Sequence, residues 1–421
     1  MTTTYDWVSP LRPDPTDIAE YTVRVRKAVS GAVTLNAIGN YRAKDVSAYC
    51  KEHDPFFNIG NDVRFHGNIL AMCREMTGVI IAHDFRIQNL IVANLQAQQD
   101  DWQAQYRRLM RRHYGTEGEA SARDFVEGRI DLSTLAIEYP GIEIAAEAAS
   151  CIITHNPGLM NDLARRTGLH CALLPLPFDV PGTTPAPDRA RAGPAKPGDA
   201  LDLLVFGYIG QNRCLDMICE LIRGRTDVRL HLAGQIGPPE LQEAIAALKR
   251  DGCPIIDHGF VEEEALDALI RESDLVLNLR HPTMGEVSGS QLRIFANGGL
   301  SVVCDTGWYG GLPEDTVHKI KPDRIRRDLS GLIDQIVQDP AAFDGMRCAA
   351  HAYVKREHGL DRFAEAFTRF LSVSEEACAH GRRVQFARYL GHLYHRSGAG
   401  AFADGERLLS EAERILGRGM P

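Results

Sequence analysis

The stretch "DLVLNLRHPTMGEVSGSQLRIFANGGLSVVCDTG", Asp274 to Gly307, contains an apolar segment, a loop of small residues, a helical pattern and a second apolar segment. Short apolar runs bounded by glycine and polar residues are typical of strands buried in a parallel sheet. A strand, a helix and a further strand form a βαβ unit, whose ligand crevice lies where the strands end. One carboxylate, Glu286, follows the first strand. Its position predicts a role at that crevice.

The same alternation runs along most of the chain and predicts an α/β protein with two doubly wound, Rossmann-like domains that face a cleft. The strands expected in the first half are "VTLNAI", "FFNIGN", "GVIIAHD" and "CIITHN", with helices at His66–Met76 and Gly141–Ala149. Those expected in the second half are "LDLLVFGYIG", "VRLHLAG", "PIIDHGF", "DLVLNL" and "LSVVCDTG", with helices at Leu215–Arg223, Pro239–Lys249 and Glu262–Arg271.

A Pro/Gly/Ala-rich stretch without apolar periodicity, Val180 to Ala200, predicts the boundary between the two halves and a hinge there. The expected domains are residues 1–182, on the acceptor side, and residues 201–373, which bind a nucleotide-bearing ligand, with a linker at 183–200. Residues 374–421 contain further helical patterns and form a helical tail.

Composition narrows the class of protein. The chain has 421 residues and a formal charge of −9, and a negative chain is a poor general binder of nucleic acid. No apolar run reaches the roughly 18 residues of a membrane helix. Ten cysteines without a C-x-x-C pair predict reduced thiols and neither a disulfide framework nor a metal site. The first residues do not resemble a signal peptide, so we expect a cytoplasmic protein.

One segment, "YRRLMRRHYG", is locally basic through Arg107, Arg108, Arg111 and Arg112. On a helix these side chains form a solvated face or contact an anionic lipid or a phosphorylated substrate. Contact with the inner face of a membrane is therefore one interpretation.

The second half resembles the family 4 glycosyltransferases, retaining sugar transferases of the GT-B fold, over about 170 residues in order. "LLVFGYIGQNRCLDMICELI" is similar to the strand, glycine turn and helix start of this family, and "LHLAG" with "IIDHGFVEEEALDALIRESDLVLNL" is similar to its middle section. "GEVSGSQLRIFANGGLSVVCDTG" resembles its donor-binding signature. In the first half "NIGNDVRFHGNIL" and "GVIIAHDFRIQNL" look like segments of bacterial members.

The resemblance implies transfer of a hexose-like sugar from a nucleotide-sugar donor to a glycan, lipid or protein, with retention and without a metal or other cofactor. It implies catalytic roles for Glu286, His83 and Arg213. A carboxylate that holds a ring hydroxyl favours the positive charge that develops at the anomeric carbon, and an arginine and helix-start amides stabilise the departing diphosphate. The donor-binding residues are then Gly210, Arg213, Glu286, Val287, Ser288 and Gly289, and the acceptor-side residues are Asn61, His66 and Asp84.

The sequence departs from the family pattern at several positions. The second acidic position of the signature falls on Ile294, an expected arginine falls on Tyr208, and a usual proline falls on Ser301. An isoleucine accepts no hydrogen bond from a ribose, so we expect weak discrimination between ribose and deoxyribose unless another residue makes the contact. A glutamate at 294 is expected to sharpen this discrimination if the surrounding geometry survives. Few residues precede "VTLNAI", which leaves little room for the first strand and glycine loop of this family.

Plainer interpretations stand beside these. Glu286 is then a solvated loop side chain and Arg213 an ordinary residue of a first helical turn. His83 and Asp84 are then polar groups at strand ends, and Gly234, Gly298 and Gly299 are turns or helix stops. The alternative function is a non-catalytic GT-B protein that binds a sugar nucleotide or a partner in glycan assembly, and an epimerase or phosphorylase of the same fold is a third. Donor hydrolysis without acceptor discriminates the first two.

Overall fold

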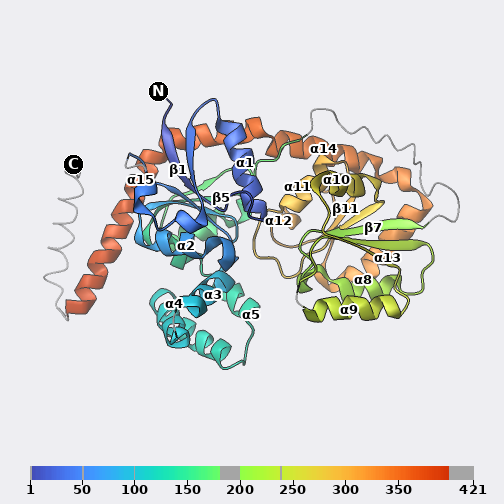
Figure 1. Ribbon diagram of the computed structural model, residues 1–421, viewed down its shortest axis with the longest axis horizontal. Helices are drawn as coiled ribbons and strands as arrows, with labels where there is room; N and C mark the ends of the chain where they lie inside the picture. Colours follow the sequence, from blue (N-terminus) through green and yellow to red (C-terminus); the bar gives the residue numbers. More distant parts are fainter. Residues whose placement is uncertain (1, 50–51, 99, 181–199, 238, 398–421) are drawn as a thin grey trace. The chain divides into compact units, whose positions relative to one another are not determined.

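The computed structural model describes residues 2–49, 52–98, 100–180, 200–237 and 239–397. The chain divides into unit 1, Met1–Leu174 with Ala364–Pro421, and unit 2, Pro175–Phe363. Each unit contains one six-stranded parallel sheet with helices on both faces (Figure 1). The predicted linker, 183–200, lies outside the described residues except for Ala200. The tail pattern "GERLLSEAERIL" also lies outside them.

The sheet of unit 1 has the strand order β2-β1-β3-β4-β5-β6. Its direction of growth reverses between β1 and β3, which is the topological switch point of a doubly wound sheet. The sheet confirms the four strands predicted in the first half. Its strands are β1 (Thr4–Val8), β2 (Thr34–Ile38), β3 (Phe56–Ile59), β4 (Gly78–Ala82), β5 (Ala149–Thr154) and β6 (Cys171–Leu173).

The expectation of little room for a first strand was wrong. Strand β1 precedes "VTLNAI" and pairs with both β2 and β3. Trp7 and Val8 are completely buried, and the Asp6 carboxylate accepts a hydrogen bond from Asn36 Nδ2 at 2.6 Å. The polar Asp6 in a strand of five residues conceals the apolar run from which strands are recognised.

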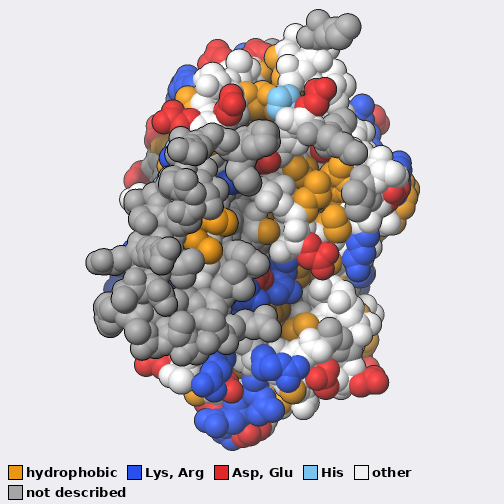
Figure 2. Space-filling model, turned by 90° about the vertical axis from the view of Figure 1, so that its left-hand side faces the viewer, with side chains coloured by type: hydrophobic (Ala, Val, Ile, Leu, Met, Phe, Trp, Pro, Cys, Tyr) orange, Lys and Arg blue, Asp and Glu red, His pale blue; other side chains and the backbone are white. Residues whose placement is uncertain are grey.

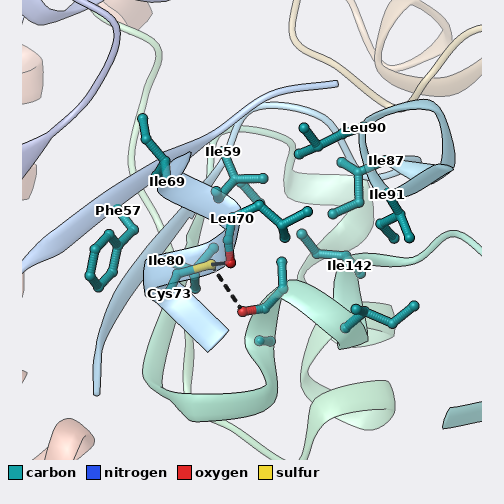
Figure 3. Close-up of a cluster of buried hydrophobic side chains, with 14 of the residues drawn as sticks. Phe57, Ile59, Ile69, Leu70, Cys73, Ile80, Ile87, Leu90, Ile91 and Ile142 are labelled. Atoms are coloured by element: carbon teal, nitrogen blue, oxygen red, sulfur yellow. Dashed lines mark hydrogen bonds between the residues drawn. The ribbon is translucent and has the colours of Figure 1, made fainter. Parts of the chain in front are cut away.

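Helices of unit 1 pack an apolar layer against this sheet. Figure 3 shows side chains from β3, β4, α2 and α3 that point toward one another, and the Cys73 thiol lies 3.4 Å from the Ala145 carbonyl oxygen. The helix expected at 141–149 is one short α-helix followed by a 3-10 turn. The helices are α1 (Asp17–Val29), α2 (Val63–Glu75), α3 (Gln88–Gln98), α4 (Trp102–Val126), α5 (Leu132–Glu138), α6 (Ile142–Ala145) and α7 (Met160–Thr167), with 3-10 turns at η1 (Asn40–Arg42), η2 (Val46–Ala48), η3 (Ala146–Ala148) and η4 (Pro157–Leu159).

The sheet of unit 2 has the order β12-β11-β10-β7-β8-β9, with its switch point between β7 and β10. All five strands predicted in the second half are confirmed, and β12 is an addition. The strands are β7 (Leu201–Phe206), β8 (Val228–Ala233), β9 (Ile255–Gly259), β10 (Leu275–Asn278), β11 (Ser301–Cys304) and β12 (His318–Ile320).

Alternate residues of β7 face opposite layers, as the two-residue period of a strand requires. Leu203 and Val205 pack in one cluster with residues of α8 and α13, whereas Leu204 and Phe206 pack with α10 and α11. The helices are α8 (Leu215–Ile222), α9 (Pro239–Arg250), α10 (Glu263–Glu272), α11 (Gly289–Ala296), α12 (Gly307–Gly310), α13 (Ile325–Gln338) and α14 (Asp344–His358), with 3-10 turns at η5 (Gln211–Arg213), η6 (Pro322–Arg324) and η7 (Pro340–Phe343).

A long helix, α15 (Leu360–Ser397), contains the first part of the predicted helical tail. From Ala364 onward it belongs to unit 1, where Phe367 lies against Trp7 and Phe56. Gly381 allows a close approach to the sheet, because a Cβ there would lie 1.7 Å from the Ser150 carbonyl oxygen. In the described part of the chain no helix is both long and apolar enough to cross a membrane.

Candidate active site

In unit 2 the predicted donor-binding residues follow β7 and β10, the two strands at the switch point. Strand β7 ends in a turn at Gly207, whose φ of 86° favours glycine. The neighbouring Gly234 also has to be glycine, because a Cβ there would lie 2.1 Å from the Gly207 carbonyl oxygen. Gly210 ends the turn and precedes η5. The turn thus has no side chain at Gly207 and Gly210, whereas Tyr208 between them is exposed.

Arg213 lies beneath this turn and is 3% exposed. Its guanidinium donates to the carbonyl oxygens of Phe206 and Tyr208 at 3.1 Å each, and to Asn278 Oδ1 at 3.0 Å. These bonds join the end of β7 to the end of β10. The structure therefore gives Arg213 a positioning role for the glycine turn, and its contact with a diphosphate stays a prediction.

The Arg213 contact begins a buried chain of hydrogen bonds. Asn278 Nδ2 donates to Gln291 Oε1 at 2.8 Å, and Gln291 Nε2 donates to Ser301 Oγ at 2.7 Å. These buried bonds link β10, α11 and β11. Ser301, where the family has proline, is thus a member of this network.

Glu286 lies in the loop after β10 and is mostly buried, with 14% of its side chain exposed. One carboxylate oxygen, Oε2, accepts from Thr283 Oγ1 at 2.7 Å and from the Met284 amide at 2.8 Å. The other, Oε1, accepts from Arg280 Nη1 at 3.3 Å. The interpretation of Glu286 as a freely solvated side chain is wrong, because the loop holds both oxygens.

The start of α11 lies three residues from this carboxylate. Ser288 is the N-cap, and its Oγ accepts from the Gln291 amide at 3.1 Å. Gly289 is the first helical residue, and Val287 precedes the cap. The first amides of a helix have no intrahelical acceptor and attract anions. The predicted donor-binding carboxylate and the start of α11 are thereby close to each other along the chain.

Two departures from the family pattern have clear structural environments. Ile294 is completely buried with Leu204, Phe206 and Val276 on one side of the sheet. A glutamate at 294 would enter this apolar cluster, so we expect it to disturb the surrounding geometry on which sharper ribose recognition depends. Tyr208 is 59% exposed at the glycine turn, and its hydroxyl lies against Gly237, where an added Cβ would be 2.9 Å from it.

In unit 1, His83 follows β4 and is surrounded by aromatic rings. Its Nε2 donates to Asn58 Oδ1 at 2.9 Å, while Asn58 Nδ2 donates to the Val8 carbonyl. Tyr21 and His155 lie 4.6 and 5.3 Å from its ring centroid. Burial lowers the pKa of His83 well below its ordinary value, with smaller contributions from His155 and His66. The neutral ring holds its proton on Nε2 and presents Nδ1 as an acceptor.

The residues predicted for the acceptor side meet at the neighbouring strand end. The backbone amide of Asn61 donates to Asp84 Oδ2 at 2.8 Å. The side-chain oxygen of Asn61, Oδ1, accepts from the backbone amide of Leu90 at the start of α3. His66 Nδ1 donates to the Asn58 carbonyl at 3.1 Å. A Cβ at Gly60 would lie 2.9 Å from His66 Nε2 and 3.4 Å from Asp84 Oδ2, so these groups flank one glycine. The structure brings the predicted residues of unit 1 together.

The predicted basic face is divided among local ion pairs. Figure 2 shows basic side chains gathered at its lower end, where Figure 1 places α4, with acidic side chains among them. Arg108 and Arg111 pair with Asp101 and Glu119 on the surface of α4, whereas Arg112 pairs with Glu147. Arg107 is partly exposed on the same helix. Charges that pair locally give a weaker field than an unpaired run would.

Sequence reasoning missed several residues of both crevices. Arg280, Asn278 and Gln291 hold the unit 2 site, and Asn58 and His155 hold the unit 1 site. Asn278, Arg280 and His155 lie at or just after strand ends, where ligand crevices form. Their position at strand ends could have identified them from the sequence. Their hydrogen-bond partners became known only from the contacts between strands.

No family model matches the sequence, and no curated protein matches it. Solved structures do match the fold. Sucrose-phosphate synthase from Thermosynechococcus elongatus is 14% identical, covering 89% of this chain and 100% of its own, with a TM-score of 0.58. Anabaena HepE in complex with UDP and glucose is 12% identical, covering 88% and 100%, with a TM-score of 0.55.

The same Anabaena protein in complex with UDP-glucose is 13% identical, covering 88% of this chain and 99% of its own, with a TM-score of 0.53. The fold is the GT-B fold. At these identities the likeness shows the fold and does not establish the donor, the acceptor or the reaction of this chain.

Proposed function

We propose that the protein is a glycosyltransferase that moves a sugar from a nucleotide-sugar donor to a glycan, lipid or protein acceptor. The observation that carries the proposal is the arrangement at the unit 2 switch point. There the Glu286 carboxylate, held by Thr283 and Met284, precedes the capped start of α11 by three residues. The GT-B fold supports the same function.

In the proposed mechanism the helix-start amides at Ser288 and Gly289 bind the donor diphosphate. Charge grows on the diphosphate as the glycosidic bond breaks, and backbone donors that are already oriented stabilise it without reorganisation. Glu286 accepts a hydrogen bond from a ring hydroxyl and favours positive charge at the anomeric carbon. Retention of configuration and independence from a metal are parts of the proposal that come from the family resemblance.

Uridine diphosphate sugars are the first donors to test, because HepE was solved with UDP and UDP-glucose. The full chain is incubated with UDP-, GDP- and ADP-sugars without acceptor, and release of nucleoside diphosphate is measured together with thermal stabilisation. A donor that binds the native state raises the melting temperature according to its concentration and Kd. We expect one base to stabilise the protein and one sugar to be hydrolysed slowly.

The rival is a binding protein without catalysis, and the exposed Tyr208 in place of an arginine favours it. Stabilisation by a sugar nucleotide without release of diphosphate, both alone and with glycan acceptors, supports this rival. If no donor stabilises the protein and no donor is hydrolysed, both functions are contradicted.

A further inference from the structure

A cavity of about 530 Å³ in unit 1 lies away from both crevices and takes no part in the proposed reaction. Its lining comes from four parts of the unit: α4, the segment before β5, the end of α7, and α15. Among the lining residues are Arg112, His113, Glu143, Glu147, Arg166 and Arg388.

The cavity lies at the edge of the sheet opposite to the unit 1 crevice. Glu143 and Glu147 precede the start of β5, and Arg166 precedes β6, whereas His83 and Asp84 follow the end of β4. In a parallel sheet all strands begin at one edge and end at the other. Strands of five or six residues at about 3.3 Å per residue separate the two edges by roughly 16 to 20 Å. The cavity is therefore a separate site.

Guanidinium groups exceed carboxylates around Glu147. Arg74 Nη2 contacts Glu147 Oε2 at 3.1 Å, and Arg112 contacts the other oxygen of the same carboxylate. Arg388 adds a third guanidinium, which donates to the Thr167 carbonyl at 2.5 Å. Glu143 is paired with Arg166 at 2.9 Å, and Arg166 also pairs with Asp162 at 3.0 Å, so the guanidinium groups exceed the carboxylates by one. The balance leaves the cavity positive and favours an anion.

His113 adds a polar group that lacks a hydrogen bond in the described structure. Its Nε2 is buried and lies 4.0 Å from Glu147 Oε2, beyond hydrogen-bond distance. Burial lowers the pKa of His113 to about 4, the charge of Glu147 opposes this shift, and Arg112, Arg74 and Arg388 add to it. The imidazole is therefore neutral at pH 7, and it lines the cavity with a ring nitrogen that lacks a hydrogen-bond partner in the described structure.

We propose that this cavity binds a phosphate-bearing small molecule. Arg112, Arg166 and Arg388 come from three helices, and several guanidinium forks suit an anion with three terminal oxygens better than a monovalent carboxylate. The volume is within the usual range for small ligands and exceeds that of a bare phosphate ion. Each oxygen of Glu143 and Glu147 already contacts a guanidinium or the Tyr114 hydroxyl, so it is the volume of the cavity that leaves room for a polyol beyond the phosphate.

The test uses the full chain and calorimetric titration with inorganic phosphate and with glucose 6-phosphate, at an ionic strength matched with sodium chloride. Arg388→Gln is expected to weaken binding at least tenfold, because it removes a charged donor but keeps much of the bulk of the side chain. Arg123→Gln, an exposed position of α4, is the matched control and is expected to change the Kd less than twofold. Unchanged circular dichroism verifies folding.

A comparison with the donor site and a vesicle experiment identify where the phosphate binds and which kind of molecule carries it. The proposed donor site also accepts phosphate, so binding there appears equally in the native protein and in Arg388→Gln. Flotation with phosphatidic acid vesicles, against phosphatidylcholine vesicles, tests a lipid headgroup, and a loss of flotation in Arg388→Gln supports the site with a lipid as its ligand. Equal binding of every probe by native protein and Arg388→Gln overturns the proposal, as does no binding of any probe.

Discussion

At the residue scale, the loop after β10 holds the Glu286 carboxylate in one orientation. It accepts from a hydroxyl and a backbone amide on one oxygen and contacts Arg280 with the other. A carboxylate held in this way keeps its position when a ligand arrives, so little free energy is spent on orienting it.

We expect Glu286→Gln to reduce turnover by about 10² while nucleotide binding is largely kept, because a neutral amide does not stabilise developing positive charge. Turnover and nucleotide affinity are measured on the same preparation. Glu272→Gln, at the exposed end of α10, is the control and should retain full activity. Turnover of Glu286→Gln within about threefold of the native protein would exclude Glu286 from the mechanism.

Ile294 belongs to the core rather than to the crevice. We expect Ile294→Glu to lower the free energy of unfolding by about 3 to 5 kcal/mol, because it buries an unpaired charge. Ile294→Val should cost about 0.5 to 1.5 kcal/mol. Denaturant unfolding of the two variants provides the comparison. A stable Ile294→Glu protein with improved selectivity for ribose would contradict the position of this side chain.

At the element scale, α15 shows how one helix completes unit 1. Phe367 packs on Trp7 and Phe56, and Arg382 pairs with Asp54 at 2.9 Å. Gln385 Nε2 donates to the Ala149 carbonyl at 2.8 Å. The helix thereby satisfies groups of segments more than 200 residues earlier in the chain.

Two glycines inside helices should respond to alanine with opposite signs. Gly381→Ala forces a Cβ against the Ser150 carbonyl, and we expect a loss of about 1 to 3 kcal/mol of stability despite the better helix propensity of alanine. At Gly331 in α13 an added Cβ would meet no atom within 4 Å, so Gly331→Ala should gain about 0.4 to 1 kcal/mol. Chemical unfolding measures both. A stabilised Gly381→Ala protein would show that α15 does not approach β5 closely.

At the scale of the whole molecule, unit 1 buries several histidines in their neutral form. Burial lowers the pKa of His66 and of His113 to about 4, and that of His83 well below its ordinary value. In the unfolded chain each titrates near a pKa of about 6.5. Between these values the unfolded state binds more protons than the folded state, so acid favours unfolding.

We therefore expect stability to be fully present above about pH 6.5 and to fall as the pH decreases toward about 4. Each histidine contributes a slope of up to about 1.4 kcal/mol per pH unit. Unfolding by urea at several pH values measures the slope. His66→Asn should reduce the slope of stability against pH by the contribution of one proton, whereas His170→Asn, at an exposed position, should leave the slope unchanged. Equal slopes for native protein and His66→Asn would show that His66 is not buried as a neutral ring.

Most of the strands were predictable because burial in a parallel sheet leaves a continuous apolar run in the sequence. The glycine turn after β7 and the loop that carries Glu286 were predictable for the related reason that strand ends are marked by glycine and polar residues. Strand β1 was missed because Asp6 interrupts its apolar pattern, and that residue is accommodated by Asn36 on the next strand.

Only the tertiary structure decided which distant segments contact one another. Arg213 meets Asn278 across 65 residues, and Arg388 meets Thr167 across 221. Periodicity records whether a side chain is buried, but it does not record which partner it meets, because pairing depends on the order of strands and the packing of helices. For that reason the sequence by itself determined the strand and loop that hold Glu286. The partners of Arg213, the burial of Ile294 and the arginine cavity of unit 1 followed from the fold.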